Sequence, residues 1–183
     1  MQPAKGANQK TNNPTLKKWV PGFEDVDTLM DADSKAKTLH VDGDPLFAVR
    51  VAYQTPMVLA TTADTEPEIA YPYTFEDALV FENLTFFSTL DGIGLVRKFR
   101  EAIAAGGGTA AIGEGMYRAL KDGKKAEFAL DVLDVKNFDG IVVPGYIAEG
   151  LEWLLMQLKK KQVEILPQEE PAELPEQTER AEA

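Results

Sequence analysis

The chain has 183 residues, of which 44% are hydrophobic, and it carries a formal net charge of −11. It contains no cysteine and one histidine, which excludes disulfides, thiol chemistry and metal sites rich in thiolate or imidazole ligands. The acidic balance argues against broad electrostatic attraction to nucleic acid or anionic lipid. The apolar fraction is sufficient for a folded core.

The two ends of the chain differ in charge from each other and from the middle. Residues 1–17 are polar and basic, which predicts a flexible arm, whereas residues 167–183 hold six glutamates and three prolines and predict a disordered acidic tail. Residues 18–166 remain as a single folded domain. The first residues lack the apolar run of a secretory signal, and the apolar stretch 146–158 is too short and too charged to span a bilayer. A cytoplasmic location is therefore expected.

The first half of the domain contains mostly strand patterns. A short helix is predicted over 23–30, from apolar residues at helical spacing. Residues 38–41 and 46–53 flank an Asp-Gly pair and predict a hairpin. Another strand is predicted over 57–61, and 69–75 is predicted to be irregular or an edge strand because Pro72 interrupts it.

The second half of the domain contains both short apolar runs, which predict strands, and apolar residues at helical spacing, which predict helices. Short strands are predicted at 78–81, 84–88, 128–135 and 141–143, with a last edge strand at 163–166. Helical spacing predicts a helix over 93–103, capped by Ser88 or Thr89 and ended by Gly106–Gly108, and a weaker helix over 109–120.

The strongest helical pattern begins near Pro144. Its apolar stripe comprises Ile147, Leu151, Leu154, Leu155 and Leu158. Taken together, the elements predict an α+β fold, with a mostly antiparallel sheet of about five to seven short strands packed by two or three helices.

The segments that resemble ligand sites fail the requirements of those sites. The glycine-rich segment 106–115 lacks the Lys-Ser/Thr of a phosphate-binding loop, and a loop starting at Asp31 lacks the ligand and the glycine that calcium needs. Asp131 and Asp134 fall three apart on a predicted strand, so they are expected to point to opposite faces. No catalytic residue, cofactor or metal site is predicted.

The candidate interface residues are aromatic or basic. Tyr71, Tyr73 and Phe75 alternate, so an extended chain presents all three rings on one face, as a core face, a protein interface or a base-stacking surface. Trp153 points away from the leucine stripe and is a candidate interface anchor. The basic arm ends in a further candidate set, formed by Lys17, Lys18 and Trp19.

Three functions are compatible with these features. The favoured one is a non-enzymatic protein-interaction module, such as an assembly factor, structural component or accessory subunit, which binds one or more protein partners or itself. The second is a single-stranded nucleic-acid-binding protein with an acidic C-terminal tail, although the net charge disfavours it. The third is a metal-dependent enzyme whose site is built from scattered carboxylates such as Asp131 and Asp134. No membrane partner is expected.

Overall fold

The computed structural model describes residues 5–11, 13–19, 23–42, 47–59, 68–136 and 138–165. Within these ranges the chain forms eight helices and four short strands. The strands pair into two separate two-stranded sheets, so the molecule is mostly helical. The predicted α+β fold with about five to seven strands is therefore wrong.

The N-terminal part of the molecule has its own small apolar cluster. It contains helices α1 (Pro14–Trp19) and α2 (Val26–Asp31) and a hairpin of β1 (Thr38–His40) and β2 (Ala48–Arg50). Asp25 caps α2 by accepting a hydrogen bond of 2.9 Å from the backbone of Thr28. The buried cluster consists of Leu16, Phe23, Leu29 and Val51.

The two strands of the predicted hairpin are confirmed, whereas its turn at 43–46 lies outside the described residues. The arm predicted over 1–17 includes most of α1, and Thr11 and Leu16 within it are buried. The predicted acidic tail, 167–183, also lies outside the described residues. The division into arm, domain and tail stays a prediction.

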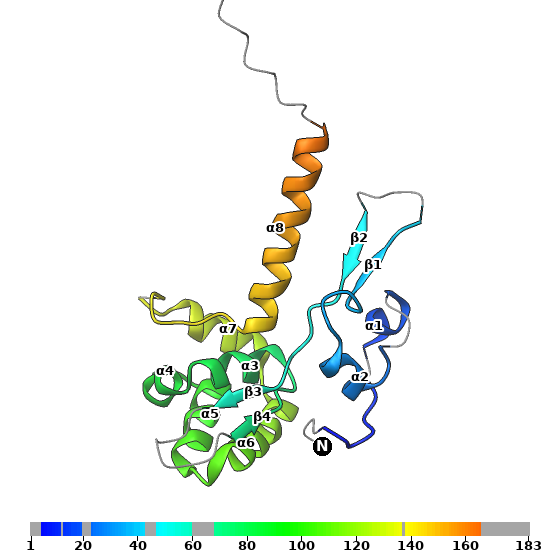
Figure 1. The fold of residues 1–183 in the computed structure, drawn as a ribbon. Coiled ribbons are helices and arrows are strands. Elements are labelled where there is room, and N and C mark those ends of the chain that lie inside the picture. Colours follow the sequence, from blue (N-terminus) through cyan, green and yellow to red (C-terminus); the bar gives the residue numbers. More distant parts are fainter. Residues whose placement is uncertain are drawn as a thin grey trace, which may run out of the picture.

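The larger part of the molecule is a helical body. Strands β3 (Met57–Leu59) and β4 (Glu68–Ala70) pair in antiparallel fashion beside it, as Figure 1 shows. The body comprises the helices α3 (Phe75–Glu82), α4 (Leu84–Thr89), α5 (Gly94–Ala105), α6 (Gly108–Asp122) and α7 (Lys125–Leu133). Its largest fully buried side chains are Phe87, Phe99, Leu95, Met116, Val80 and Val96.

Helices α3 and α4 replace the strands predicted at 78–81 and 84–88. Every residue from Glu76 to Phe81 is buried, so α3 is covered on all sides and its sequence lacks the polar face that marks a surface helix. A short apolar run of this kind fits a buried strand equally well. The local signal for a helix is the capping box, in which Asp77 accepts hydrogen bonds from the backbone and hydroxyl of Thr74, at 2.6 and 3.0 Å.

Helix α7 replaces the strand predicted at 128–135. Phe128 is buried and Val132, four residues later, is partly buried, while Leu130 is 67% exposed. Phe128 and Val132 are both four apart, as on one face of a helix, and an even number of residues apart, as on one face of a strand, so the helical period was mistaken for that of a strand. The edge strand predicted at 163–166 is also wrong as far as Ile165, because the last helix continues to that residue.

The helices predicted over 93–103 and 109–120 are confirmed as α5 and α6. The cap is not Ser88 or Thr89, because α5 begins only after Ile93. Gly106 ends α5 with φ of 65°, a conformation that glycine adopts without strain. Only Gly106 and Gly107 of the glycine-rich segment form a turn between two helices, because residues 108–115 belong to the first half of α6.

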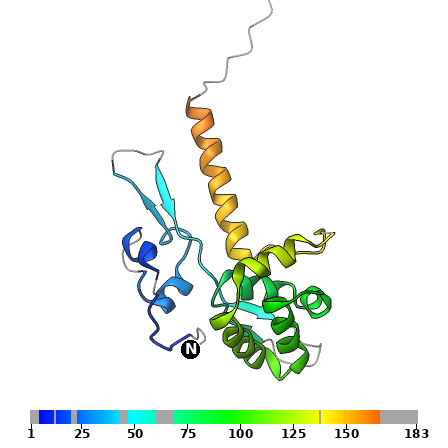
Figure 2. The ribbon, with the colours of Figure 1, turned by 180° about the vertical axis from the view of Figure 1, so that it is seen from behind.

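Helix α8 (Gly145–Ile165) stands on the helical body and runs beside the β1–β2 hairpin, as both ribbon views show (Figures 1 and 2). The segment before it, predicted as a strand at 141–143, has no regular structure. The amide and carbonyl of Val142 instead bond to the side chain of Asn83, at 2.7 and 2.8 Å. A side chain thus takes the place of a neighbouring strand, and Pro144 is fully buried at the foot of the helix.

Candidate functional site

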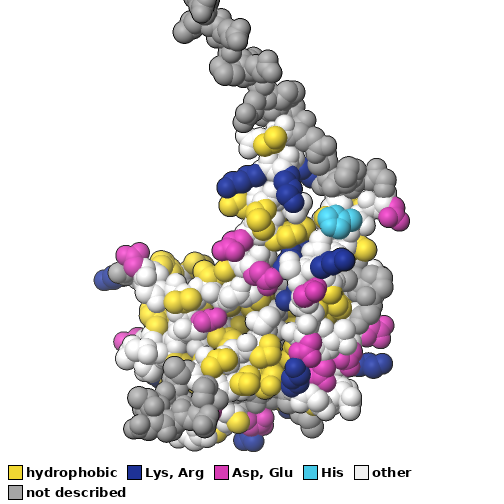
Figure 3. All heavy atoms as spheres, viewed as in Figure 1, with side chains coloured by type: hydrophobic (Ala, Val, Ile, Leu, Met, Phe, Trp, Pro, Cys, Tyr) yellow, Lys and Arg dark blue, Asp and Glu magenta, His cyan; other side chains and the backbone are white. Residues whose placement is uncertain are grey.

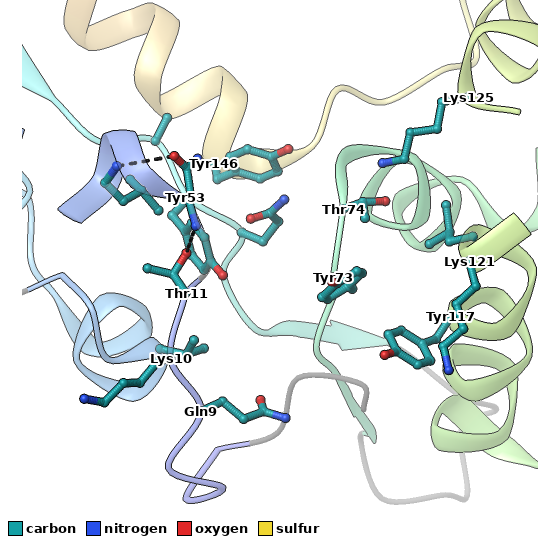
Figure 4. A pocket seen from close by; sticks show the side chains of 16 residues that line it. Gln9, Lys10, Thr11, Tyr53, Tyr73, Thr74, Tyr117, Lys121, Lys125 and Tyr146 are labelled. Carbon is teal, nitrogen blue, oxygen red and sulfur yellow. Dashed lines mark hydrogen bonds between the residues drawn. The ribbon is translucent and has the colours of Figure 1, made fainter. Parts of the chain in front are cut away.

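A pocket of about 880 Å³ lies between the N-terminal part and the helical body. Figure 4 shows Gln9, Lys10 and Thr11 on one side of it and Tyr73 and Tyr117 on the other. The remaining labelled side chains that line it are Tyr53, Thr74, Lys121, Lys125 and Tyr146. Its walls are therefore aromatic and hydroxyl groups with ammonium groups at the edge.

Two of the phenols that line the pocket, Tyr146 and Tyr53, have raised pKa values. Burial, together with the negative charges of Asp77 and Glu76, raises the pKa of Tyr146 to about 12. Burial also raises the pKa of Tyr53. Because an un-ionised phenol is a poor base and a poor nucleophile, these groups favour binding over catalysis.

Two lysines of the pocket, Lys125 and Lys121, already have partners within the molecule. The Lys125 ammonium donates a hydrogen bond of 2.8 Å to Glu76, and Lys121 lies 5.0 Å from the centroid of the Tyr117 ring. The Tyr117 ring meets Tyr73 edge-on, with centroids 5.2 Å apart. These contacts stabilise the wall of the pocket and leave little charge for a ligand.

The Lys125–Glu76 pair gives a pH-dependent prediction. Burial raises the pKa of Glu76, but the hydrogen bonds from Lys125 and Thr74 outweigh it and hold this pKa below its ordinary value of 4.5. A carboxyl whose pKa is lowered by folding stabilises the fold at pH values above its ordinary pKa. This contribution to stability is lost as the pH falls through the lowered pKa. Because Lys125 is half exposed, Lys125→Met is expected to cost only about 1 kcal/mol at neutral pH.

Urea unfolding from pH 7 down to pH 3 tests this prediction. The difference between the wild-type protein and Lys125→Met should shrink as pH falls through the lowered pKa of Glu76. Lys124→Met removes a neighbouring exposed lysine as the control and should leave the whole profile unchanged. A constant difference at every pH would contradict the role given to Glu76.

A second candidate site is the outer face of α8, which follows from how this helix packs. Glu149 forms ion pairs with Arg50 of β2 and with Lys37, whose ammonium lies 3.8 Å away. A β-carbon at Gly150 would lie 3.0 Å from that of Ala52, so the helix approaches the end of the hairpin closely at this glycine. Lys161 lies 5.8 Å from the ring centroid of Phe47. The small and polar side of α8 therefore faces the hairpin.

The apolar stripe of α8 lies on a different face of the helix from the side that contacts the hairpin. Gly150, Trp153, Gln157 and Lys161 are half-buried, at the helical spacing of one face. The leucines lie one or two positions after these residues, on a neighbouring face roughly 100° around the helix, and are exposed to 60% at Leu151, 46% at Leu154, 52% at Leu155 and 55% at Leu158. We call these four residues the leucine stripe.

Further exposed apolar side chains occur near the foot of α8. They are Leu130 and Leu133 of α7 and Val142 and Val143 of the segment before α8. Hydrophobic side chains are visible over α8 and over the region of α7 in Figure 3. Burying surface of this kind releases roughly 25 cal/mol per Å², so an exposed apolar patch marks a surface that another molecule can cover.

The structure separates the three aromatic residues predicted to form a row. Tyr73 lines the pocket, Tyr71 is half-buried, and Phe75 is the first residue of α3. The chain is a strand only as far as Ala70, so the alternation does not continue as a strand through all three positions. Their role as an interface stays a prediction.

The other predicted interface residues lie apart from the leucine stripe. Trp153 points away from the stripe, as expected, and its ring centroid lies 6.0 Å from the guanidinium carbon of Arg50. Lys17 and Lys18 are exposed on α1, while the side chain of Trp19 is outside the described part. Sequence reasoning named the residues of the stripe but assigned them to the core, because a helical apolar pattern does not say which side faces solvent.

Of the carboxylates considered for metal binding, Asp131 has a structural partner. Asp131 accepts a hydrogen bond of 3.1 Å from the backbone of Ile93, at the start of α5, and Asp134 ends α7. Among the described residues no three acidic or histidine side chains converge as a metal site. None of the helices in these residue ranges is both long and apolar enough to cross a membrane.

Comparisons of this chain with protein-family models, with curated proteins and with solved structures find no match.

Proposed function

We propose that the protein is a non-enzymatic interaction module, an assembly factor or accessory subunit, that holds another polypeptide on the leucine stripe of α8. The observation that supports this proposal is the exposure of four leucines on one face of a 21-residue helix. A surface helix normally turns such a face toward its own core. Here a neighbouring face contacts the hairpin and the leucines stay exposed, so the apolar face is available to a partner.

The pocket supports an enzymatic function less well. The pKa values of its Tyr146 and Tyr53 are raised, and Lys125, a candidate cation, is paired with Glu76. A general base needs a pKa near the working pH, and raised phenol pKa values move away from it. We therefore place the function on the surface of α8, and we propose the cytoplasm as the compartment, which suits a chain without cysteine.

Site-specific photo-crosslinking in cells tests the proposal. A photoreactive amino acid at position 154 or 158 should form adducts with a polypeptide, because these leucines are exposed on the proposed binding face. The matched control is position 156, where Met156 is 54% exposed on the same helix but off the leucine stripe. Adducts confined to 154 and 158 are expected. Equal labelling at 156, or none at any position, would contradict the proposal.

The same face gives a substitution that should act on binding alone. Leu154→Ser with Leu158→Ser should abolish the adducts formed from a probe at position 151. It should change the free energy of unfolding by less than about 1 kcal/mol, because both side chains are already half exposed. Met156→Ser with Val163→Ser, two exposed residues off the stripe, is the control double variant. Thermal and urea unfolding of the purified variants measure whether the fold is intact.

A further inference from the structure

We infer that the polypeptide that covers the leucine stripe is a second copy of this chain, bound so that the two α8 helices run antiparallel. The inference rests on the proposed function, since it names the partner of the same surface. It is carried by the charge distribution along α8 together with the exposure of the stripe. A two-fold symmetric interface joins the same surface of both copies, so that surface must be complementary to itself. The exposed leucines and the opposite charges of α8 can each be matched with those of a second copy in this way.

The charges of α8 are separated along its length. Glu152 lies in its first half, and Lys159 and Lys160 lie toward its end. Glu149 and Lys161, in contrast, contact the hairpin of the same molecule, and Glu164 is in the last turn. In a parallel pair, the acidic half would lie beside an acidic half and the lysines beside lysines. In an antiparallel pair, each acidic half lies beside the basic half of the other copy. The sequence of α8 is therefore complementary to itself in the antiparallel direction only.

The leucines match in the same arrangement. If the two-fold axis crosses the pair between the levels of Leu154 and Leu158, Leu154 of each copy packs on Leu158 of the other. Leu155 then meets its own counterpart across the axis. Residues at this spacing of three and four interdigitate in pairs of helices. The register that buries the leucines is thus consistent with the register that joins the charges.

One ion pair defines this register. Glu152 and Lys159 are seven residues apart, two helical turns, so they lie on the same flank of the leucine stripe. Matching flanks face each other across the axis of an antiparallel pair, which brings Glu152 of each copy near Lys159 of the other. Neither residue has an ion pair in the part of the chain that the structure describes. Both charges are therefore available to a second copy.

The geometry of the molecule leaves room for the pairing. The hairpin contacts α8 on the side of Gly150, Trp153 and Lys161, and it leaves the four leucines of the neighbouring face 46–60% exposed. The helix is about 30 Å long at 1.5 Å per residue, and the helical body is attached at its N-terminal end. In an antiparallel pair the two bodies lie at opposite ends.

Charge exchange in the purified full chain tests the inference. Light scattering after gel filtration should give the mass of two chains for the wild-type protein at concentrations up to roughly 100 µM. Glu152→Lys or Lys159→Glu alone should weaken the dimer about tenfold, since each creates two repulsive pairs worth up to about 1 kcal/mol each. The double variant, which exchanges the charges, should restore the affinity of the wild-type protein. Leu154→Ser with Leu158→Ser should give monomers.

Two results would overturn the inference. A wild-type protein that stays monomeric at roughly 100 µM excludes a second copy as the partner. A dimer that the charge exchange does not restore excludes the antiparallel register. If the chain is monomeric but position 158 still crosslinks to a different protein, this inference fails and the proposed function stands. If the stripe crosslinks to nothing, both fail.

Discussion

Replacement of Phe99 by alanine should lower the free energy of unfolding by about 3–5 kcal/mol, the range typical of truncating a buried phenylalanine. Phe99 has no exposed surface. Its ring meets Phe128 of α7 at a centroid distance of 5.7 Å, and Phe128 stacks on Phe87 of α4 at 5.9 Å. The substitution therefore removes the α5 ring from a three-ring cluster that joins α4, α5 and α7. A cavity at this point is lined by residues of separate helices and cannot close fully.

Urea unfolding of Phe99→Ala and of Phe138→Ala measures the effect. Phe138 is 46% exposed, so its truncation should cost less than about 1 kcal/mol. Equal losses for the two variants would show that Phe99 is not a central core residue. Since a small domain has roughly 5–15 kcal/mol of stability, Phe99→Ala should also reduce the yield of folded protein.

Replacement of Asn83 by alanine should cost about 2–3 kcal/mol, although the residue is neither apolar nor catalytic. The buried Asn83 side chain donates 2.8 Å hydrogen bonds to the carbonyls of Leu79 and Val142 and accepts one of 2.7 Å from the amide of Val142. Alanine leaves the partly buried polar groups of Val142 without these partners. Because Val142 lies three residues before α8, the substitution should also loosen the attachment of that helix.

Hydrogen exchange separates this local effect from general destabilisation. The amide of Val142 should exchange faster in Asn83→Ala than expected from the change in global stability alone. Asn83→Asp is the matched variant, because an ionised carboxylate still accepts from the Val142 amide but no longer donates to the two carbonyls. Unchanged protection of Val142 in both variants would contradict the role assigned to Asn83.

The sequence predicted the elements whose pattern has a single interpretation. The hairpin strands around 38–50, the strand from Met57, and helices α5, α6 and α8 have clear periods or clear turn residues. The sequence could not identify α3, because every residue from Glu76 to Phe81 is buried and the helical period is hidden. It also could not identify α7, where Phe128 and Val132 fit both a strand and a helix. Because of these two errors, a sheet was predicted where the structure has a helical body.

The residues of the candidate site could be predicted from the sequence, but the direction in which the leucine stripe faces could not. The leucine stripe is evident in the sequence, yet an amphipathic helix with an outward apolar face has the same pattern as one with an inward face. The difference comes from tertiary contacts, namely the ion pairs of Glu149 with Arg50 and Lys37 and the close approach at Gly150. Those contacts join residues about 100 positions apart, which no local pattern reports.

The position of α8 after the helical body has a consequence for synthesis. The helices from α3 to α7 are contiguous in the chain and build the main core before any part of α8 is needed. A ribosome releases the chain from its N-terminus at roughly 5–20 residues per second, so the body can begin to fold while the leucines are still in the exit tunnel. The leucines then emerge on a molecule whose core is complete. They are therefore kept from being trapped in that core while it forms.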